Sequence, residues 1–479
     1  MSYTKIAKST PFEGAPKINL ASIVGASAGK PILIRIPVTG QRPIAYGAEN
    51  LPEGLTLHDN ILSGAIAEEG DYVITLTAEN ALGRTEKTVT LEIKDGNVLV
   101  TPLMGFTSWN AFGADVTQED MIAIADRMVE LGLTEYGYTY VNTDSSWQDT
   151  YGGEYDAIMP NHKFPDMKAM TDYIHSLGLK CGIYSSPFLH AWGEPPFLPF
   201  IPGCTVGERD YRFSGMNTGI GVIHKEANCV KQWDAWGFDY LKYDWSPADP
   251  VNADIMRKEL LKASRDFGYC ITVNALPEYW EYWSRYVNSY RCGTDSLGTW
   301  DNLMQIFDSY FKFNHCRVKG HYQDLDMLDV GTFKPHFVRN DLTEDEAIIA
   351  YTIRAFFNSP IQISSTLEAA EGFEMDLYGN DEMIALNQDC AFSGAHPIFA
   401  VGNRFHVFEM QTEDGGYAYA VFNLTEEEQA PCLVFGGTSA LRDVWAKEDL
   451  PAADRLSLSM MPHTVRVIKT EKKVDAVKM

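Results

Sequence analysis

The sequence predicts an α/β protein in which a (β/α)8 TIM barrel is flanked by an N-terminal and a C-terminal β-sandwich. Strand-like and helix-like stretches alternate through the middle of the chain, as in parallel strands covered by helices. Both ends instead carry short runs of alternating apolar and polar residues, separated by turn residues. At 479 residues the chain is also too long for one hydrophobic core, so we expect several domains.

The first predicted domain is a β-sandwich over residues 1–98. Its strand signals are short alternating runs such as ILIRIPV at 32–38, DYVITLTAEN at 71–80 and KTVTLEI at 87–93. The stretch from residue 51 to 80 resembles an immunoglobulin-like module.

The second predicted domain, over residues 99–392, is the barrel. Thr117 stands three residues before Asp120 and ahead of a helical-period stretch, which predicts a capped first helix. Eight strand candidates occur, the number that a barrel requires. They are MGFTSW (104–109), YTYVNTD (138–144), KCGIYSS (180–186), YLKYDW (240–245), YCITVNA (269–275), SYRCGTD (289–295), YQDLDML (322–328) and PIQISST (360–366). An open doubly wound sheet would alternate in the same way, but no Gly-rich phosphate turn follows an early strand.

The third predicted domain, over residues 393–479, is an antiparallel β-sandwich. Its strand signals are RFHVFEM at 404–410, YAYAVFNL at 417–424 and HTVRVIKT at 463–470, with polar turns between them.

The charge of the chain narrows the choice of partners. A formal net charge of −26 repels phosphate backbones and anionic lipids, so we expect no nucleic-acid partner and no membrane. A neutral substrate fits better. The start of the chain has no apolar signal segment, which favours the cytoplasm, although a secreted or periplasmic protein without its signal peptide would look the same. A homo-oligomer stays open.

Three predicted barrel strands end in a carboxylate, at Asp144, Asp244 and Asp295. The carboxyl ends of barrel strands meet at one mouth, where such residues are catalytic in known barrels. Each Asp alone is better explained as a helix cap, but three in successive strand-end positions favour chemistry. Two carboxyl groups about 5 to 6 Å apart, one a nucleophile and one a proton donor, would cleave a glycosidic bond with retention.

Other residue types near these carboxylates suit a sugar pocket. Lys242 precedes Asp244 by two positions and therefore shares its strand face, where its charge favours the ionised carboxylate. Arg291 precedes Asp295 and could donate to a sugar hydroxyl. Trp109 and Trp147 are expected as pocket walls, since the apolar faces of sugars stack on aromatic rings.

Several motifs occur in the order in which the glycoside hydrolase family 27 alpha-galactosidases carry them, and the chain resembles that family over about residues 100–470. They are TPLMGFTSWNAFG (101–113), YVNTDSSW (140–147), GLKCGIY (178–184), WGFDYLKYD (236–244), RCGTD (291–295), GHYQDLDML (320–328), NSPIQISSTL (358–367), IALNQD (384–389), AYAVFNLT (418–425), LRDVW (441–445) and MPHTVRVI (461–468).

The resemblance implies a retaining exo-glycosidase that removes terminal alpha-D-galactosyl residues from neutral oligosaccharides or glycosides. It implies that Asp244 is the nucleophile and Asp295 the general acid/base. Substrate contacts are expected from Trp109, Asp144, Ser145, Trp147, Lys242, Asn274, Arg291 and Asp326. No metal or organic cofactor is expected, and no cluster has metal-ligand spacing.

The sequence departs from the family pattern at two contact positions. Ser145 stands where the family has a second acid that grips the 4- and 6-hydroxyls, and Leu276 stands where it has a Glu for the 2-hydroxyl, with Glu278 two residues later. Alternatives are therefore a β-L-arabinopyranosidase, an alpha-N-acetylgalactosaminidase, or a non-catalytic carbohydrate-binding protein on the same fold. The long apolar segment 194–221 is expected to roof the pocket.

Overall fold

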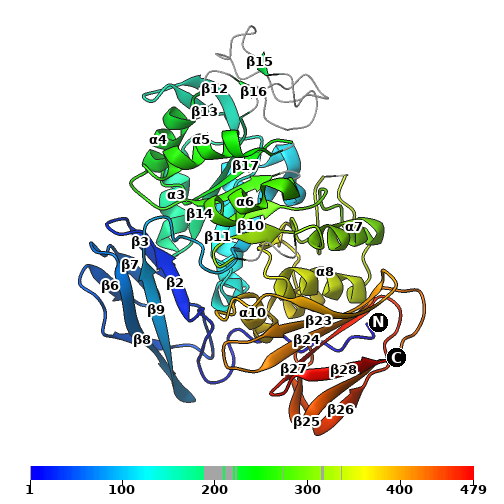
Figure 1. Ribbon diagram of the computed structural model, residues 1–479. Coiled ribbons are helices and arrows are strands. Elements are labelled where there is room, and N and C mark those ends of the chain that lie inside the picture. Colours follow the sequence, from blue (N-terminus) through cyan, green and yellow to red (C-terminus); the bar gives the residue numbers. More distant parts are fainter. Residues whose placement is uncertain are drawn as a thin grey trace.

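The middle of the chain forms a barrel of eight parallel strands, seen at the centre of the computed structural model in Figure 1. The structure describes residues 2–187, 209–210, 220–221, 224–246, 248–272, 275–313, 318–335 and 337–479. The barrel strands are β10 (Met104–Thr107), β11 (Tyr140–Asn142), β14 (Lys180–Ser185), β17 (Tyr240–Asp244), β18 (Gly268–Thr272), β19 (Ser289–Arg291), β20 (Tyr322–Asp324) and β21 (Ile361–Ile363). Seven lie within the expected runs and β18 begins one residue before its run, so the predicted barrel is confirmed.

The strands follow one another around the sheet in sequence order, and β21 returns to pair with β10. A parallel bridge between Leu328 and Ile363 links the segment after β20 to β21 and closes the ring. Nearly every described strand residue is buried, as expected for strands that have the barrel interior on one side and helices on the other.

Helices cover the outside of the barrel, and all but the last two lie in the connections between its strands (Figure 1). They are α1 (Ser108–Phe112), α2 (Gln118–Glu130), α3 (Met167–Ser176), α4 (Glu226–Trp236), α5 (Pro250–Leu260), α6 (Trp280–Tyr286), α7 (Trp300–Tyr310), α8 (Glu344–Phe356), α9 (Phe373–Tyr378) and α10 (Asp381–Asn387). Thr117 and Asp120 form the expected capping box, in which each side chain accepts the other residue's backbone N–H. Two short strand pairs lie in loops between barrel strands: β12 (Gln148–Gly152) with β13 (Ala157–Pro160), and β15 (Arg209–Asp210) with β16 (Ile220–Gly221).

Two small sheets precede the barrel and share one core. The four-stranded sheet contains β2 (Ile23–Ala26), β9 (Gly83–Ile93), β8 (Gly70–Asn80) and β5 (Ala45–Glu49), and the three-stranded sheet contains β3 (Ile32–Arg35), β7 (Ile61–Gly64) and β6 (Leu55–His58). A further short pair joins β1 (Lys17–Ile18) to β4 (Val38–Thr39). Leu76 and Leu91 from the larger sheet meet Ile32 and Leu62 from the smaller one in a single apolar cluster. Neither sheet could bury its apolar face alone, so the two stabilise each other.

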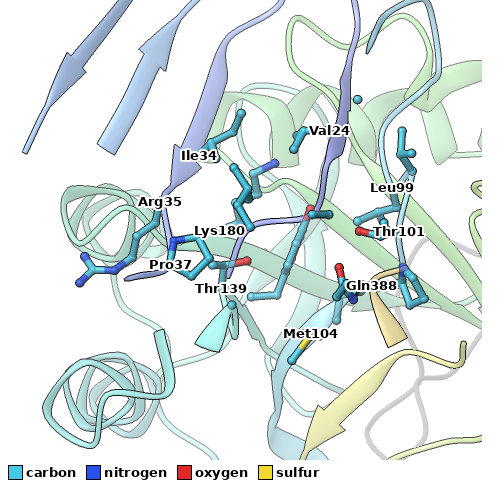
Figure 2. A pocket seen from close by; sticks show the side chains of 18 of the residues that line it. Val24, Ile34, Arg35, Pro37, Leu99, Thr101, Met104, Thr139, Lys180 and Gln388 are labelled. Carbon is cyan, nitrogen blue, oxygen red and sulfur yellow. Dashed lines mark hydrogen bonds between the residues drawn. The ribbon is translucent and has the colours of Figure 1, made fainter. Parts of the chain in front are cut away.

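The N-terminal sheets are attached to the barrel by buried charges. Glu135, which follows α2, is 4% exposed and pairs with Arg35 at 3.1 Å and with Arg42 at 2.9 Å. Figure 2 shows the neighbouring cavity of about 130 Å³, between the N-terminal sheets and the residues that begin the barrel strands, Met104 and Lys180 among those that line it. The first residues run elsewhere: the backbone N–H of Thr4 donates to Asp345 of α8 at 2.8 Å, and that of Ala7 donates to the carbonyl of Trp445.

A seven-stranded antiparallel sheet follows the barrel. Its strands are β22 (His396–Val401), β23 (Phe405–Gln411), β24 (Tyr417–Asn423), β25 (Cys432–Asp443), β26 (Glu448–Ser457), β27 (Thr464–Thr470) and β28 (Val474–Lys478). Successive residues of β24 point to opposite sides: Ala420 and Phe422 join the barrel core, whereas Tyr419 and Val421 join a separate apolar cluster within the C-terminal domain. One face of the sheet therefore packs against the barrel, and the other face forms the core of the C-terminal domain.

Among the described residues, no helix is both long enough and apolar enough to cross a lipid bilayer.

Candidate active site

A cavity of about 350 Å³ lies among residues at and just beyond the carboxyl ends of the barrel strands. Its lining consists of Trp109, Asn110, Asp144, Ser145, Tyr184, Lys242, Asp244, Ser246, Thr272, Arg291, Asp295, Ser296, Leu297, Met327 and Phe337. Five charged side chains, three acidic and two basic, and several apolar ones thus face one space of monosaccharide size. Both Asp244 and Asp295 are among them.

Strand register brings several of these side chains together. Tyr184 of β14 lies beside Lys242 of β17, and Asp244 lies beside Thr272 of β18. Residues paired across neighbouring parallel strands point to the same side of the sheet, and Lys242 and Asp244 share a face because they are two positions apart. The polar residues therefore form layers at the mouth rather than isolated groups.

Asp144 and Lys242 form a buried ion pair on one wall. Lys242 Nζ donates to Asp144 Oδ2 at 2.6 Å, and the side chains are 15% and 3% exposed. Burial lowers the pKa of Lys242, but the neighbouring carboxylates, led by Asp144, outweigh that effect, so its pKa lies above the ordinary value. The backbone N–H of Ser145 donates to the other carboxylate oxygen of Asp144 at 2.7 Å. This wall offers fixed donors and acceptors to sugar hydroxyls.

Asp244 lies at the end of β17, where Tyr184 donates a hydrogen bond to its Oδ2 at 2.7 Å. Burial raises the pKa of Asp244 to about 7, although the charge of Lys242 and the Tyr184 hydroxyl oppose the rise. A carboxylate with few hydrogen-bond donors is a stronger nucleophile than a fully solvated one, and about half of it is ionised near neutral pH.

Asp295 occupies a different environment. Its side chain is 75% exposed, and Arg291 Nη2 donates to its Oδ1 at 2.7 Å. The loop after β19 that carries it is fixed by Asn302 of α7, whose amide donates to the carbonyl of Asp295 at 2.8 Å and accepts from the N–H of Leu297. Asp244 is thus partly enclosed with a raised pKa, whereas Asp295 stands at the open side beside an arginine, so the two carboxylates have different environments.

Arg291 is shared between two carboxylates. Its Nη2 also contacts Asp326 Oδ2 at 2.8 Å, and its Nη1 donates to Thr272 at 3.3 Å. Asp326 is 3% exposed and accepts a second hydrogen bond, from the backbone N–H of Ser296, at 2.7 Å. Asp326 is not among the lining residues, and its carboxylate holds Arg291 and the loop beside Asp295.

Seven of the expected site residues line the cavity: Trp109, Asp144, Ser145, Lys242, Asp244, Arg291 and Asp295. Trp147 is not among the lining residues. Its side chain is fully buried, packs edge-on against Trp236 and donates from Nε1 to the carbonyl of Tyr184 at 2.9 Å. This hydrogen bond links it to β14. Asn274 and most of the segment 194–221 lie outside the described residues.

Sequence reasoning did not select several lining residues, chief among them Tyr184, Met327 and Phe337. A signal existed for Tyr184, because inward positions alternate along each strand and its strand is one of the eight expected. Met327 follows a buried Asp in the segment after β20, and Phe337 lies 6.0 Å from Trp109 between ring centroids. No spacing rule links Phe337 to the site.

The two residues that depart from the family pattern, Ser145 and Leu276, lie in different places. Ser145 lines the cavity next to Asp144. Leu276 is not among the lining residues, and Glu278 is exposed on the surface near the start of α6. Within the described part of the chain, no three His, Cys, Asp or Glu side chains are grouped so as to hold a metal ion.

The chain is similar in sequence to known proteins. The family model Melibiase_2, described as alpha galactosidase A, matches residues 101–193, which include Trp109 and Asp144. Alpha-galactosidase A of Cellvibrio japonicus is 28% identical over 347 residues, or 68% of this chain and 77% of that protein. Alpha-galactosidase 2 of Arabidopsis thaliana is 30% identical over 307 residues, or 62% and 69% of the two chains.

The similarity extends to the whole architecture. The crystal structure of a candidate alpha-galactosidase/melibiase from Bacteroides fragilis superposes with a TM-score of 0.84 and 28% identity, over 96% of this chain and 98% of that one. Such coverage includes the N-terminal sheets, the barrel and the C-terminal sheet. On the strength of this similarity, the chain is a glycoside hydrolase and belongs to the alpha-galactosidases of glycoside hydrolase family 27.

Proposed function

We propose that this glycoside hydrolase removes terminal alpha-D-galactosyl residues from neutral oligosaccharides or glycosides, with retention of configuration at the anomeric carbon. The observation that carries the proposal is that Asp244 and Asp295 line one cavity together with Asp144, Lys242 and Arg291. The formal net charge of −26 supports a neutral substrate, because it would repel an anionic one.

The two carboxylates divide the reaction between them. Asp244 attacks the anomeric carbon from the buried side while Asp295 transfers a proton to the departing glycosidic oxygen, which leaves a glycosyl ester on Asp244. Asp295, now a carboxylate, then takes a proton from water as that water attacks the same carbon. Free galactose leaves and Asp244 is regenerated.

The other residues hold the sugar. Lys242 and Asp144 present a fixed donor and acceptor, respectively, on one wall, while Arg291 holds the carboxylate of Asp295. Trp109 and Phe337 offer aromatic surface for the apolar face of a ring. Hydroxyl groups of the sugar bind favourably to these fixed partners, because no flexible loop has to be ordered first.

Azide separates the two catalytic roles. In Asp295→Ala the glycosyl-enzyme forms from an activated substrate, and azide then attacks it to give alpha-galactosyl azide. In Asp244→Ala azide replaces the missing nucleophile and gives the beta anomer. Proton NMR of the products distinguishes them. The opposite pattern would exchange the two roles, and wild-type release of beta-galactose as the first product would exclude retention.

A panel of aryl glycosides tests the sugar. We expect the highest kcat/KM on the alpha-D-galactopyranoside, above the β-L-arabinopyranoside and the alpha-N-acetylgalactosaminide. Faster turnover of the arabinoside would assign Ser145 to a pocket that accepts a sugar without a C6 carbon. Binding with no turnover of any of the three would favour a carbohydrate-binding protein.

A further inference from the structure

The segment that follows β20 is held from below by one buried arginine. Arg354 of α8 is 1% exposed, and its Nε donates to the carbonyl of Asp326 at 2.8 Å. Its Nη2 donates to the carbonyls of Leu325 at 3.0 Å and Met327 at 2.6 Å. Three consecutive carbonyl groups thus converge on a single guanidinium, whose rigid planar donors suit such a fork.

The middle residue of this segment has a backbone conformation that needs support. Asp326 has a φ of +67°, in the left-handed region that an L side chain rarely adopts. Such a conformation is strained and persists where the surroundings hold it. Arg354 bonds the carbonyl of Asp326 and those on either side of it, so it supplies that hold.

The conformation of Asp326 decides where its carboxylate lies. Asp326 Oδ2 contacts Arg291 Nη2 at 2.8 Å and accepts from the N–H of Ser296 at 2.7 Å. The same Nη2 contacts Asp295, and Ser296 is the residue after it. Each contact of Asp326 therefore reaches the acid/base through one intermediate group.

Arg354 carries a charge that helix packing alone does not require. Within the described chain no carboxylate lies at ion-pair distance from it, and its Nη1 donates to the carbonyl of Ala350 in its own helix. An apolar side chain in the same place would avoid the cost of burying a cation. A buried arginine at this position is explained if the protein needs the three carbonyl groups to be held in place.

We propose that Arg354 is a positioning residue for the acid/base: by fixing the backbone around Asp326, it sets the places of Arg291 and of the loop that carries Asp295. This inference rests on the proposed function. Arg354 touches no substrate, since it is buried and absent from the cavity lining.

Leaving-group dependence separates this role from a structural one. A poor leaving group such as methoxide needs a proton from Asp295 as the bond breaks, whereas fluoride departs with little help. A misplaced acid therefore slows methyl alpha-D-galactoside far more than alpha-D-galactosyl fluoride. A general loss of folded enzyme slows both substrates equally. The value of kcat/KM reports this first step alone.

The variants are Arg354→Met, Arg354→Lys and Asp326→Asn, with Thr352→Val as a matched control. Thr352 lies on α8 and is fully buried, but it accepts a hydrogen bond from Trp445 at 3.0 Å, away from the segment after β20. Its replacement disturbs the same helix without touching Asp326. Arg354→Lys keeps the charge with fewer donors, and Asp326→Asn keeps the backbone, so both test the role should Arg354→Met not fold.

We expect Arg354→Met and Asp326→Asn to lose about 100-fold in kcat/KM on the methyl galactoside and less than about 5-fold on the fluoride, the size of a lost acid. Arg354→Lys should lie between them and the wild type. Equal losses on both substrates, or the same pattern in Thr352→Val, would overturn the positioning role. A wild type that turns over neither galactoside would instead contradict the proposed function.

Discussion

The Tyr184 hydroxyl lies 2.7 Å from Asp244 Oδ2 and donates a hydrogen bond to it. This bond favours the charged form of a carboxyl whose pKa burial raises to about 7. The nucleophile must be ionised to attack, so the acid limb of kcat/KM in the free enzyme should lie near pH 7. A pH profile with a limb below about 5 would contradict this assignment.

Removal of that bond should move the limb. In Tyr184→Phe the carboxylate loses a donor, so the pKa of Asp244 rises and the limb shifts upward by roughly 0.5 to 1 pH unit. Profiles of kcat/KM from pH 4 to 9 measure the shift. Tyr173→Phe is the control, because Tyr173 donates to Asp126 at 2.6 Å on the surface of α3 and should leave the profile unchanged.

The raised pKa of Asp244 also costs stability. The unfolded carboxyl releases its proton near pH 4 and the folded one near pH 7, so the native state becomes less stable as the pH rises through that window. Asp244→Asn does not titrate. Its free energy of unfolding should therefore exceed that of the wild type at pH 8 by about 1 to 3 kcal/mol more than at pH 5. Urea denaturation at both values provides the comparison, and an equal difference at both pH values would refute it.

Ser145 should control the choice at C6. Ser145→Asp adds an acceptor for a 6-hydroxyl at a buried cavity position, and this gain is available only to galactose. The ratio of kcat/KM for the galactoside over the β-L-arabinopyranoside should rise by about 10-fold, because this is the effect of one good hydrogen bond to a charged group. Absolute rates should fall, since the new carboxylate lies next to Asp144. An unchanged ratio would place C6 elsewhere.

The N-terminal sheets should contribute stability without changing catalysis. Glu135 joins Arg35 and Arg42 to the barrel at a buried site, on the side away from the active-site mouth. Glu135→Ala leaves those arginines unpaired and should cost about 2 to 4 kcal/mol of unfolding free energy. Its kcat/KM at 25 °C should match the wild type. Exposed Glu49→Ala controls for loss of an acid, and a drop in kcat/KM would give the sheets a role in catalysis.

Several site residues were predictable because strand geometry is periodic. Asp144, Asp244 and Asp295 end or follow strands that the apolar pattern located, and parallel strands bring such ends to one mouth. Lys242 followed from its two-residue spacing to Asp244. Trp147 shows the limit of prediction from sequence. An aromatic residue near a carboxylate gives the same sequence pattern whether it faces the cavity or is buried away from it.

Sequence by itself determined the eight strands, the order of elements and the two carboxylates, because apolar periodicity and strand-end position depend on neighbours along the chain. Tertiary structure alone decided that Tyr184 donates to Asp244, that Asp326 is enclosed behind Arg291, and that Arg354 holds the segment after β20. Arg354 and Asp326 are 28 residues apart. Contacts of that kind depend on how helices pack against the barrel. No local sequence pattern shows which way a side chain points toward a residue so distant along the chain.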